Sequence, residues 1–330
     1  MAIELINPKT GQPLIRVGDH LRDASGNRFS IVNGVPRITE APNYSESFGV
    51  QWARFAKTQL DRDAAGLQLS SRRFFAETRW PAESLAGQDI LEVGSGAGRF
   101  SRVVLERTLG TLFSVDYSDA VTANYANNGQ LAPDRFHLFQ ASIYDLPFPD
   151  NSFDKVFCFG VLQHTPDFAG SVAALIAKAK PGGEIVVDFY PINGWWTKVN
   201  AKYILRPVTK RLSHARLLRL IESNIDWLIK VQFFLHRCGL GIATRFLPVC
   251  NVKDSFPPTL TESEIREWAI LDTFDQYSPE HDHPQRIRDV AQLFERCGAD
   301  VTFSGVERFE GTTAAVVRGR KRATGRDGPR

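Results

Sequence analysis

The 330 residues carry a formal net charge of +3, and 43% of them are hydrophobic and 23% charged. These fractions match globular averages and exclude disordered and fibrous classes, and the length favours about two domains. Because the four cysteines form no Cys-x-x-Cys pair, and because no stretch shows the ~18 uninterrupted apolar residues of a membrane span or the pattern of a secretion signal, we expect a metal-free protein of the reducing cytoplasm.

The first 85 residues are predicted to form two small parts ahead of a larger domain. Residues 1–42 alternate short apolar runs with Gly, Asn and Asp turn signals, which is typical of a small β module. Residues 43–85 place Phe48, Trp52 and Phe55 at helical spacing. We therefore expect a β module followed by a helical lead-in.

From residue 86 onward the pattern is that of an α/β domain. Short buried strands alternate with helical stretches over 86–190, which predicts a parallel, doubly wound Rossmann-like sheet. The alternation stops over 191–284, where apolar residues at steps of three and four indicate a helical insertion. It resumes over 285–318 with one helix and closing strands, and residues 319–330 form a basic tail.

The most informative segment is the glycine-rich stretch after the first strand of this domain. An apolar strand with the acidic residue Glu92 leads into Gly94, Gly96 and Gly98, and a helix follows. Glycines allow a tight turn and close approach of a ligand to the backbone, and a helix N-terminus offers unpaired N–H groups, so the loop favours a nucleotide-like ligand. A dinucleotide site needs Gly-x-Gly-x-x-Gly, and its third glycine falls on Arg99, which argues against nicotinamide cofactors.

Two residues at the end of the next strand support a nucleoside ligand. Asp116 ends an apolar strand eighteen residues after Gly98, where a carboxylate can accept hydrogen bonds from both ribose hydroxyls. Tyr117 follows it and offers a ring that can stack on adenine. The pair favours a ligand that carries an adenosine group.

Three motifs lie downstream: Gln-Ala-Ser-Ile-Tyr-Asp-Leu-Pro-Phe at 140–148, Asn-Ser-Phe-Asp-Lys-Val at 151–156 and Phe-Gly-Val-Leu-Gln-His at 159–164. Together with the glycine loop, they resemble the class I S-adenosylmethionine-dependent methyltransferases, in the branch of the type 11 methyltransferases. The resemblance is strong over 88–190 and weak over 285–318. It implies S-adenosylmethionine as cofactor, S-adenosylhomocysteine as product and an enzyme that transfers methyl groups.

The resemblance also implies roles for particular residues. Gly94 and Gly96 would line the methionine part of the cofactor, and Glu92 would hold its amino group directly or through water. Ser142 stands where many family members have an acid that contacts the adenine amino group, so we expect a weaker contact there. Ile143 would add an apolar contact.

Two residues ahead of the core, Trp52 and Arg79, are expected to close the cofactor pocket or to pair with the cofactor's carboxylate. Helix packing for Trp52 and a plain surface charge for Arg79 are the alternatives. The full set of expected cofactor contacts is Trp52, Arg79, Glu92, Gly94, Ser95, Gly96, Asp116, Tyr117, Ser142, Ile143 and Phe159.

The N-terminal module has a looser resemblance. Its ending, Phe-Ser-Ile-Val-Asn-Gly-Val-Pro at 29–36, is similar to that of the zinc-ribbon-like module fused to some bacterial methyltransferases, in which two cysteine pairs precede it. Asn7, Thr10 and the loop 23–26 stand at those positions here. The resemblance therefore implies a metal-free relic with a packing role.

His164 is the first candidate for a group beside the methyl acceptor. It follows the fourth strand at the carboxyl edge, where doubly wound sheets bind ligands, and a neutral imidazole can take a proton from a hydroxyl. A hydrogen-bonded packing role is the alternative. Residues 272–284 are predicted to form a loop that closes over the acceptor, with Tyr277 and His281 as polar contacts, or else a solvated loop. The i, i+2 spacing of its two histidines argues against a zinc site, so the catalytic candidates are His164, His281 and Tyr277.

The insertion is strongly basic. Residues 195–245 hold ten Lys or Arg against two acids, with several tryptophans among them. Because the insertion leaves the sheet on the acceptor side, we expect a lid that selects the substrate. Its composition suits an anionic or lipid-linked acceptor and also a membrane surface, and a solvated helical bundle is the plain alternative.

We therefore predict methyl transfer from S-adenosylmethionine to a small-molecule or lipid-linked acceptor, at oxygen in preference to nitrogen or carbon. Two alternatives stay open. One is an RNA methyltransferase that uses the basic lid, although no RNA-binding motif accompanies it and nucleic acid is the less favoured partner. The other is a regulatory protein that binds S-adenosylmethionine without turnover. The oligomeric state is left open.

Overall fold

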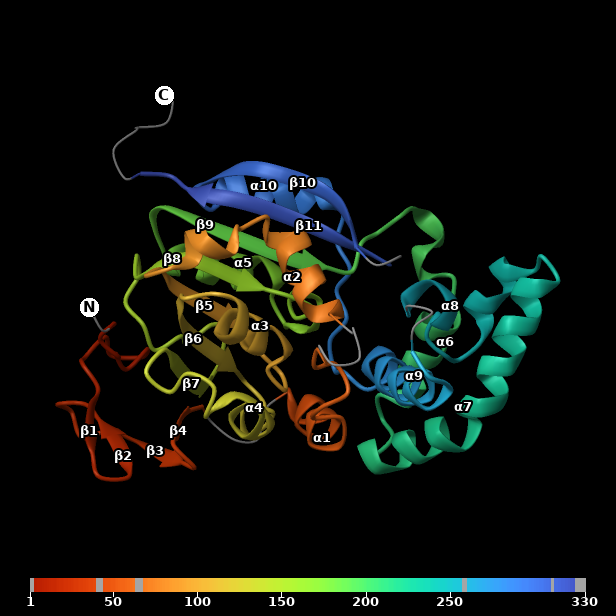
Figure 1. Ribbon diagram of the computed structural model, residues 1–330, viewed down its shortest axis with the longest axis horizontal. Helices are drawn as coiled ribbons and strands as arrows, with labels where there is room; N and C mark the ends of the chain where they lie inside the picture. The colour runs from red at the N-terminus through yellow and green to blue at the C-terminus, as the bar shows by residue number, and fades with distance from the viewer. Residues whose placement is uncertain (1–2, 40–43, 63–67, 257–259, 310–311, 324–330) are drawn as a thin grey trace.

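The computed structural model of the chain describes residues 3–39, 44–62, 68–256, 260–309 and 312–323. Within them, eleven strands form one sheet in the order β1-β2-β3-β4-β7-β6-β5-β8-β9-β11-β10, and a group of helices stands beside one end of it (Figure 1). The predicted α/β class is confirmed.

Five parallel strands form the centre of the sheet. From β5 the chain steps to β6 and β7 toward one edge, and then returns to β8 and β9 on the other side of β5. Ligands of such sheets bind where the winding reverses, at the carboxyl ends of the strands, which here is the gap between β5 and β8. The strands are β5 (Asp89–Val93), β6 (Thr111–Asp116), β7 (Phe136–Ala141), β8 (Phe153–Cys158) and β9 (Ala179–Phe189).

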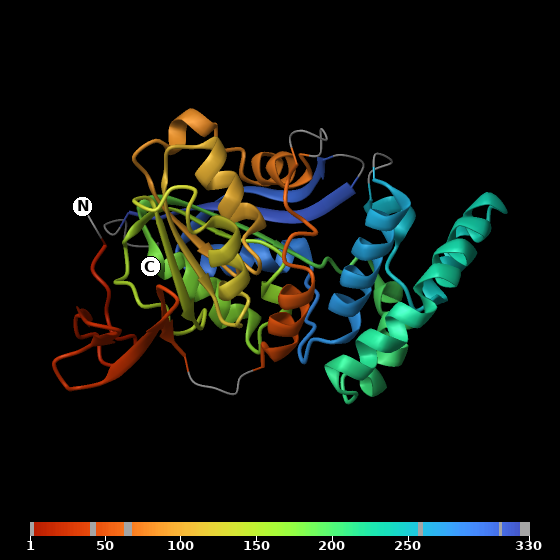
Figure 2. The same cartoon turned by 60° about the horizontal axis from the view of Figure 1, so that its bottom comes forward.

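Helices cover both faces of these strands (Figure 2). Successive strand side chains point to opposite faces. Ile90 and Leu112 pack in a cluster with residues of α2, α3 and α4, whereas Leu91 and Phe113 pack in a cluster with residues of α5 and α10. The helices are α2 (Leu69–Thr78), α3 (Arg99–Arg107), α4 (Val121–Asn128), α5 (Phe168–Lys178) and α10 (Ile287–Arg296).

The closing strands depart from the predicted parallel sheet. β11 (Thr312–Lys321) runs antiparallel to both β10 (Ala299–Phe309) and β9, with Ala315 opposite Phe189. Only two residues separate β10 from β11, which is too short for the crossover that a parallel pair requires, so the pair is a hairpin.

The N-terminal module continues the sheet at its other edge. Its strands form an antiparallel meander, and the last of them pairs in parallel with β7, with Ile38 opposite Ala141. Where the resemblance puts metal ligands, the Asn7 amide donates to the Asp23 carboxylate at 2.6 Å, and the amide of Asn27 donates to the same oxygen at 2.7 Å. That the module binds no zinc stays a prediction. The strands are β1 (Ile15–Val17), β2 (His20–Arg22), β3 (Arg28–Val32) and β4 (Val35–Ile38).

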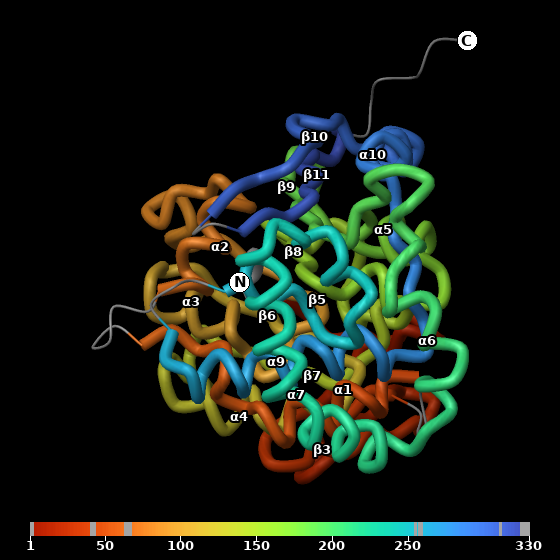
Figure 3. Tube along the Cα trace, turned by 90° about the vertical axis from the view of Figure 1, so that its right-hand side faces the viewer, coloured from red at the N-terminus to blue at the C-terminus, as the bar shows by residue number. Residues whose placement is uncertain are grey.

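The insertion and the helical lead-in share a separate hydrophobic core. Phe55, which follows α1 (Glu46–Arg54), is buried in one cluster with Ile221, Ile225 and Phe274 of the insertion. Figure 3 looks onto the insertion, with α7 nearest the viewer. No helix among the described residues is long and apolar enough to span a bilayer. The elements of the insertion are η4 (Trp195–Lys198), α6 (Ala201–Thr209), α7 (His214–Arg237), η5 (Gly241–Phe246), α8 (Val252–Ser255) and α9 (Glu262–Tyr277).

Candidate functional site

The glycine loop between β5 and α3 is shaped as its sequence predicts. Gly94 and Gly96 have φ of 83° and 53°, in the left-handed region that favours glycine. A Cβ on Gly94 would lie 2.1 Å from Val161, and one on Gly96 would lie 2.8 Å from the indole nitrogen of Trp52. The loop backbone is therefore bare at a place where only glycine fits, with Trp52 close above it.

A cavity of about 800 Å³ opens at this loop, at the carboxyl ends of the central strands. Its lining reaches from the glycine loop to α9 and to the start of the insertion. Eight of the predicted cofactor contacts lie in the lining: Trp52, Gly94, Ser95, Gly96, Asp116, Tyr117, Ile143 and Phe159.

Asp116 is held in one orientation beside the loop. One carboxylate oxygen accepts the Gly96 N–H at 2.7 Å, and the other accepts the N–H and hydroxyl of Ser118 at 2.8 and 2.6 Å. Burial raises the pKa of Asp116. A carboxylate offers about four lone-pair positions, so these three bonds leave capacity for a ribose hydroxyl.

Three predicted cofactor contacts lie elsewhere. Glu92 does not line the cavity: one carboxylate oxygen accepts the hydroxyls of Ser101 and Ser114, the other is buried without a hydrogen-bond partner among the described residues, and burial raises its pKa to about 7. The Ser142 hydroxyl accepts a backbone N–H two residues on and does not line the cavity. Arg79 follows the end of α2 in a left-handed conformation that directs its guanidinium to Glu307, 2.7 Å away, on β10. The structure therefore does not bring Arg79 to the cavity, contrary to the sequence-based assignment.

Two other arginines do line the cavity. Arg73 is paired with both Glu77 and Asp188, so its guanidinium is already neutralised. Arg99 donates only to the neutral oxygens of Ser70 and Gln59, at 3.1 and 2.8 Å. Burial lowers its pKa to about 9. Among the described residues Arg99 makes no ion pair, so it is a cation poised for an anionic ligand group beside the glycine loop.

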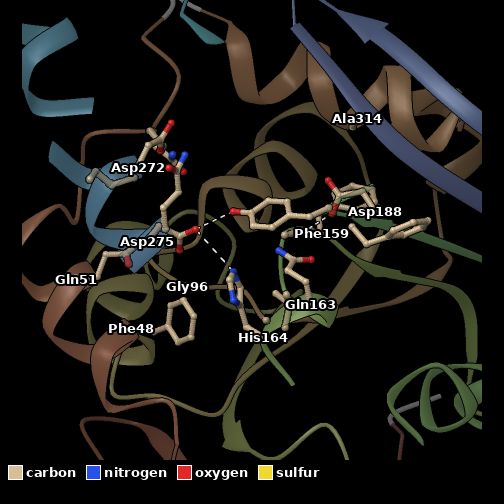
Figure 4. Close-up of a pocket in the computed structure, with 18 of the residues that line it drawn as sticks. Phe48, Gln51, Gly96, Phe159, Gln163, His164, Asp188, Asp272, Asp275 and Ala314 are labelled. Atoms are coloured by element: carbon tan, nitrogen blue, oxygen red, sulfur yellow. Dashed lines mark hydrogen bonds and ion pairs between the residues drawn. The ribbon is translucent and has the colours of Figure 1, made fainter. Parts of the chain in front are cut away.

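His164 lines the same cavity and is buried, with 3% of its surface exposed. Its Nδ1 is 3.1 Å from the backbone carbonyl of His281. A carbonyl only accepts, so Nδ1 carries the proton and Nε2 of the neutral ring keeps a lone pair. Nε2 has no hydrogen bond and lies 3.7 Å from a carboxylate oxygen of Asp275 (Figure 4). This is the arrangement of a base whose protonated form has a counter-ion ready.

Asp275 is kept ionised by its neighbours. Burial raises its pKa, but the nearby His164 ring, a hydrogen bond from Tyr190 and the charge of Lys202 outweigh burial, and the net pKa is lowered. The Tyr190 hydroxyl donates to Asp275 at 2.8 Å. The Lys202 ammonium lies 4.5 Å from the centre of the Tyr190 ring and pairs with Asp282 at 2.8 Å.

Gln163 supplies polar atoms that nothing in the described structure satisfies. Its side chain is fully buried in the cavity lining, and neither atom of its amide has a hydrogen-bond partner. Figure 4 shows it between Phe159 and His164. Buried polar groups are nearly always paired, so this amide indicates a polar ligand group beside His164.

Tyr277 and His281, the other two catalytic candidates, differ in their position relative to the cavity. Tyr277 is buried in the lining, and burial raises its pKa. The His281 side chain is not in the lining; its ring stacks on His283 and meets the edge of Tyr44. His281 therefore contributes its backbone carbonyl to His164 and not a second imidazole to the cavity. Among the described residues no group of three or more His, Cys, Asp or Glu is placed to hold a metal ion.

Sequence reasoning missed Asp272 and Asp275 because it placed residues 272–284 in a loop. In the structure α9 continues to Tyr277, and both carboxylates line the cavity. Burial, with Asp275 nearby, raises the pKa of Asp272 to about 7. The i, i+3 spacing of the two residues and the apolar run through Phe274 are signals of a helix face that the prediction did not use.

Comparison with known proteins shows that the sequence is similar to methyltransferases. Residues 91–187 match the family model of the methyltransferase domain. The chain is 25% identical over 170 residues to the tRNA U34 carboxymethyltransferase of Nautilia profundicola, covering 48% of this chain and 55% of that protein. It is 30% identical over 167 residues to the demethylmenaquinone methyltransferase of Tropheryma whipplei, covering 47% and 66%. The chain thus spans about half to two thirds of the length of these curated relatives.

Among solved structures, one similar chain comes from the complex between the Haloferax volcanii Trm112 methyltransferase activator and the putative methyltransferase. The TM-score is 0.49 with 13% sequence identity, and the alignment covers 85% of this chain and 100% of that chain.

Proposed function

The chain carries a class I S-adenosylmethionine-dependent methyltransferase domain, and on that premise we propose that the protein transfers a methyl group from S-adenosylmethionine to a hydroxyl group of a small or lipid-linked acceptor. The observation that carries the choice of oxygen is the unpartnered Nε2 of His164, buried in the cavity. An alcohol or phenol must lose a proton to attack, whereas an amine or carboxylate arrives able to do so.

The residues at the loop end of the cavity fit the cofactor. Asp116 would accept the ribose hydroxyls, Tyr117 and Ile143 would flank the adenine, and the bare backbone at Gly94 and Gly96 would admit the methionine part. When bound, S-adenosylmethionine supplies an electrophilic methyl group on a sulfonium.

Arg99 takes the role that we expected of Arg79. It is buried beside the same loop and lacks an ion pair among the described residues, so it would bind the cofactor's carboxylate. Ser70 and Gln59 hold its guanidinium in place for that contact.

The cavity residues around His164 would prepare the acceptor. The acceptor O–H bond breaks as its proton passes to Nε2 of His164, the new O–CH₃ bond forms, and the C–S bond breaks to leave S-adenosylhomocysteine. Asp275, 3.7 Å from Nε2, would stabilise the imidazolium. The Gln163 amide would orient the acceptor, and holding the reactants in line contributes ~7–11 kcal/mol to such reactions.

A second candidate function, the methylation of RNA, has specific support. The similarity to a tRNA-modifying enzyme, together with the basic insertion, favours an RNA acceptor as the alternative. A regulatory protein without turnover is the other alternative; it predicts cofactor binding and no product.

The test is release of S-adenosylhomocysteine from methyl-labelled cofactor with a panel of phenols, lipid quinols, primary amines and total tRNA. We expect labelled ether from a phenol or quinol, and His164→Ala to lower that turnover by ~10²–10⁴-fold with cofactor affinity unchanged. His283→Ala is the control, because His283 is an exposed histidine whose side chain does not line the cavity. Transfer to tRNA or amine alone, or full turnover by His164→Ala, would refute the proposal.

A further inference from the structure

The insertion exposes more large apolar side chains than the rest of the described chain. Most of the exposed ones lie between residues 195 and 246, and Trp195 alone is 88% exposed. Isolated exposed apolar residues are ordinary, but a concentration of them marks a surface that meets a partner.

On α7 these side chains form a stripe. Leu220, Trp227 and Phe234 are 48%, 50% and 64% exposed and stand seven residues apart. Seven residues make almost two turns, so the three lie along one side of the helix at steps of about 10 Å. The opposite side is buried against the rest of the insertion and consists of Leu217, Ile221, Ile225, Leu228 and Gln232. The helix therefore has two apolar faces, and only one is covered.

Positive charge surrounds the stripe without local compensation. Arg216, Lys230 and Arg237 are exposed on α7 and make no ion pair with the described residues. The only two acids of residues 195–245 are already engaged, Glu222 with Arg54 at 3.6 Å and Asp226 with Arg266 at 2.8 Å. The free charge on this surface is thus of one sign.

A pair of tryptophans extends the surface toward the cavity. The Arg245 guanidinium lies 5.8 Å from the Trp196 ring and donates to the Trp196 carbonyl at 2.8 Å, which ties η4 to η5. Trp195 and Trp196 are exposed, while Arg245 and Thr197 line the cavity. Tryptophan and arginine both suit a boundary between water and an apolar phase, because each combines an apolar body with a polar end.

We propose that this surface, comprising Leu220, Trp227, Phe234, Trp195, Trp196 and the basic side chains of α7, docks on an anionic lipid bilayer. An amphipathic helix with Trp, Phe and Leu on one side and Lys and Arg beside them binds in the plane of an interface. The positive charge of the surface favours anionic lipid. An exposed leucine such as Leu220 gains by burial in an apolar phase, which a bilayer offers and RNA does not. The inference is independent of the identity of the methyl acceptor.

The experiment is flotation of the full chain with vesicles of phosphatidylcholine alone or with 30% phosphatidylglycerol, at low and high salt. We expect binding to the mixed vesicles that weakens with salt, since each basic residue near an anionic surface contributes about fivefold in affinity. The stripe variant Leu220→Ser/Trp227→Ser/Phe234→Ser should bind at least tenfold more weakly. Arg216→Gln/Lys230→Gln/Arg237→Gln should lose binding to the mixed vesicles and its salt dependence.

The matched control replaces three exposed apolar residues on other parts of the chain, as Ile15→Ser/Leu109→Ser/Leu131→Ser, and should bind like the wild type. Circular dichroism shows whether each variant is folded; if the full stripe variant is not, single substitutions replace it. The proposal is overturned if the wild type ignores mixed vesicles, or if the stripe variant binds them fully. It is equally overturned if sedimentation shows a dimer that only the stripe variant loses, or if the wild type binds RNA and no vesicles.

Discussion

Two groups of residues in the cavity lining are built in different ways; we call them the cofactor end, around the glycine loop, and the acceptor end, around His164. The cofactor end comes from consecutive turns of one α/β sheet, from the glycine loop at 94–97 to Ile143. The acceptor end brings together α1, the turn at His164, the segment after β9 and α9, which lie far apart in the chain. The cofactor end thus depends mainly on local geometry, whereas the acceptor end depends on long-range packing.

Asp116→Ala should separate the two ends most strongly. The variant removes charge-assisted hydrogen bonds to the ribose, which are worth ~1.5–3 kcal/mol, so cofactor affinity should fall about 10- to 150-fold. Turnover at saturating cofactor should change little. Calorimetry gives the affinity, and an Asp134→Ala variant, which removes an exposed acid ahead of β7, should behave like the wild type. An equal loss in Asp134→Ala would mean that the loss does not come from the Asp116 carboxylate.

Asp275→Asn should produce the reverse pattern. The substitution keeps the shape of the side chain and removes the negative charge 3.7 Å from Nε2 of His164, so we expect about a tenfold lower kcat with cofactor affinity unchanged. Glu280→Gln, an exposed acid nearby, serves as control. A fall in cofactor affinity as large as the fall in kcat would show that the two ends are not separable.

The difference between the local cofactor end and the long-range acceptor end explains which site residues could be predicted from the sequence. The sheet order and the cofactor end follow from patterns confined to short windows, such as the strand, the glycines and Asp116, and most of those residues line the cavity. Ser142 carries the right motif, but its hydroxyl accepts a backbone N–H, which no spacing rule distinguishes from a contact with a ligand. Glu92 uses one oxygen for Ser101 and Ser114 and keeps the other unpartnered, so its contact with the cofactor stays a prediction.

Of the acceptor end, the sequence predicted His164, where this end touches the sheet, and Tyr277. Lys202 and Arg206 were grouped with the basic surface of the insertion, yet both are largely buried. Lys202 pairs with Asp282, and Arg206 donates to the carbonyls of Gln276 and Pro279. Their partners lie about 70 to 80 residues away in the chain, so composition alone cannot show that these charges hold α6 against the end of α9 and the segment after it instead of facing a substrate.

Asp272 gives the acceptor end a dependence on pH. Its folded pKa is raised to about 7, above the ordinary value near 4, so folding favours its neutral form. The stability it contributes is fully present below about pH 4 and is lost as the pH rises through 7. Asp272→Asn cannot ionise, so the free energy of unfolding of this variant relative to the wild type should rise between pH 4 and 7 by about 4 kcal/mol and level off above, and melting curves at each pH measure it. A constant difference across this range would contradict the raised pKa.

The smallest effect expected tests whether the N-terminal module supports the cofactor end alone. Arg37 on β4 donates to the side-chain oxygen of Gln140 at 2.7 Å, and the amide of Gln140 donates in turn to the backbone carbonyl of Tyr117 at 3.2 Å. These two contacts connect Tyr117 to the N-terminal module. Arg37→Ala should therefore weaken cofactor affinity by about two- to fivefold, the usual worth of one hydrogen bond. It should leave kcat at saturating cofactor unchanged, because neither of these two hydrogen bonds involves His164. Arg16→Ala, an exposed arginine of the same module, is the control. If Arg37→Ala lowers kcat and spares affinity, the module acts on the acceptor end, and the division of the cavity into a local and a long-range half fails.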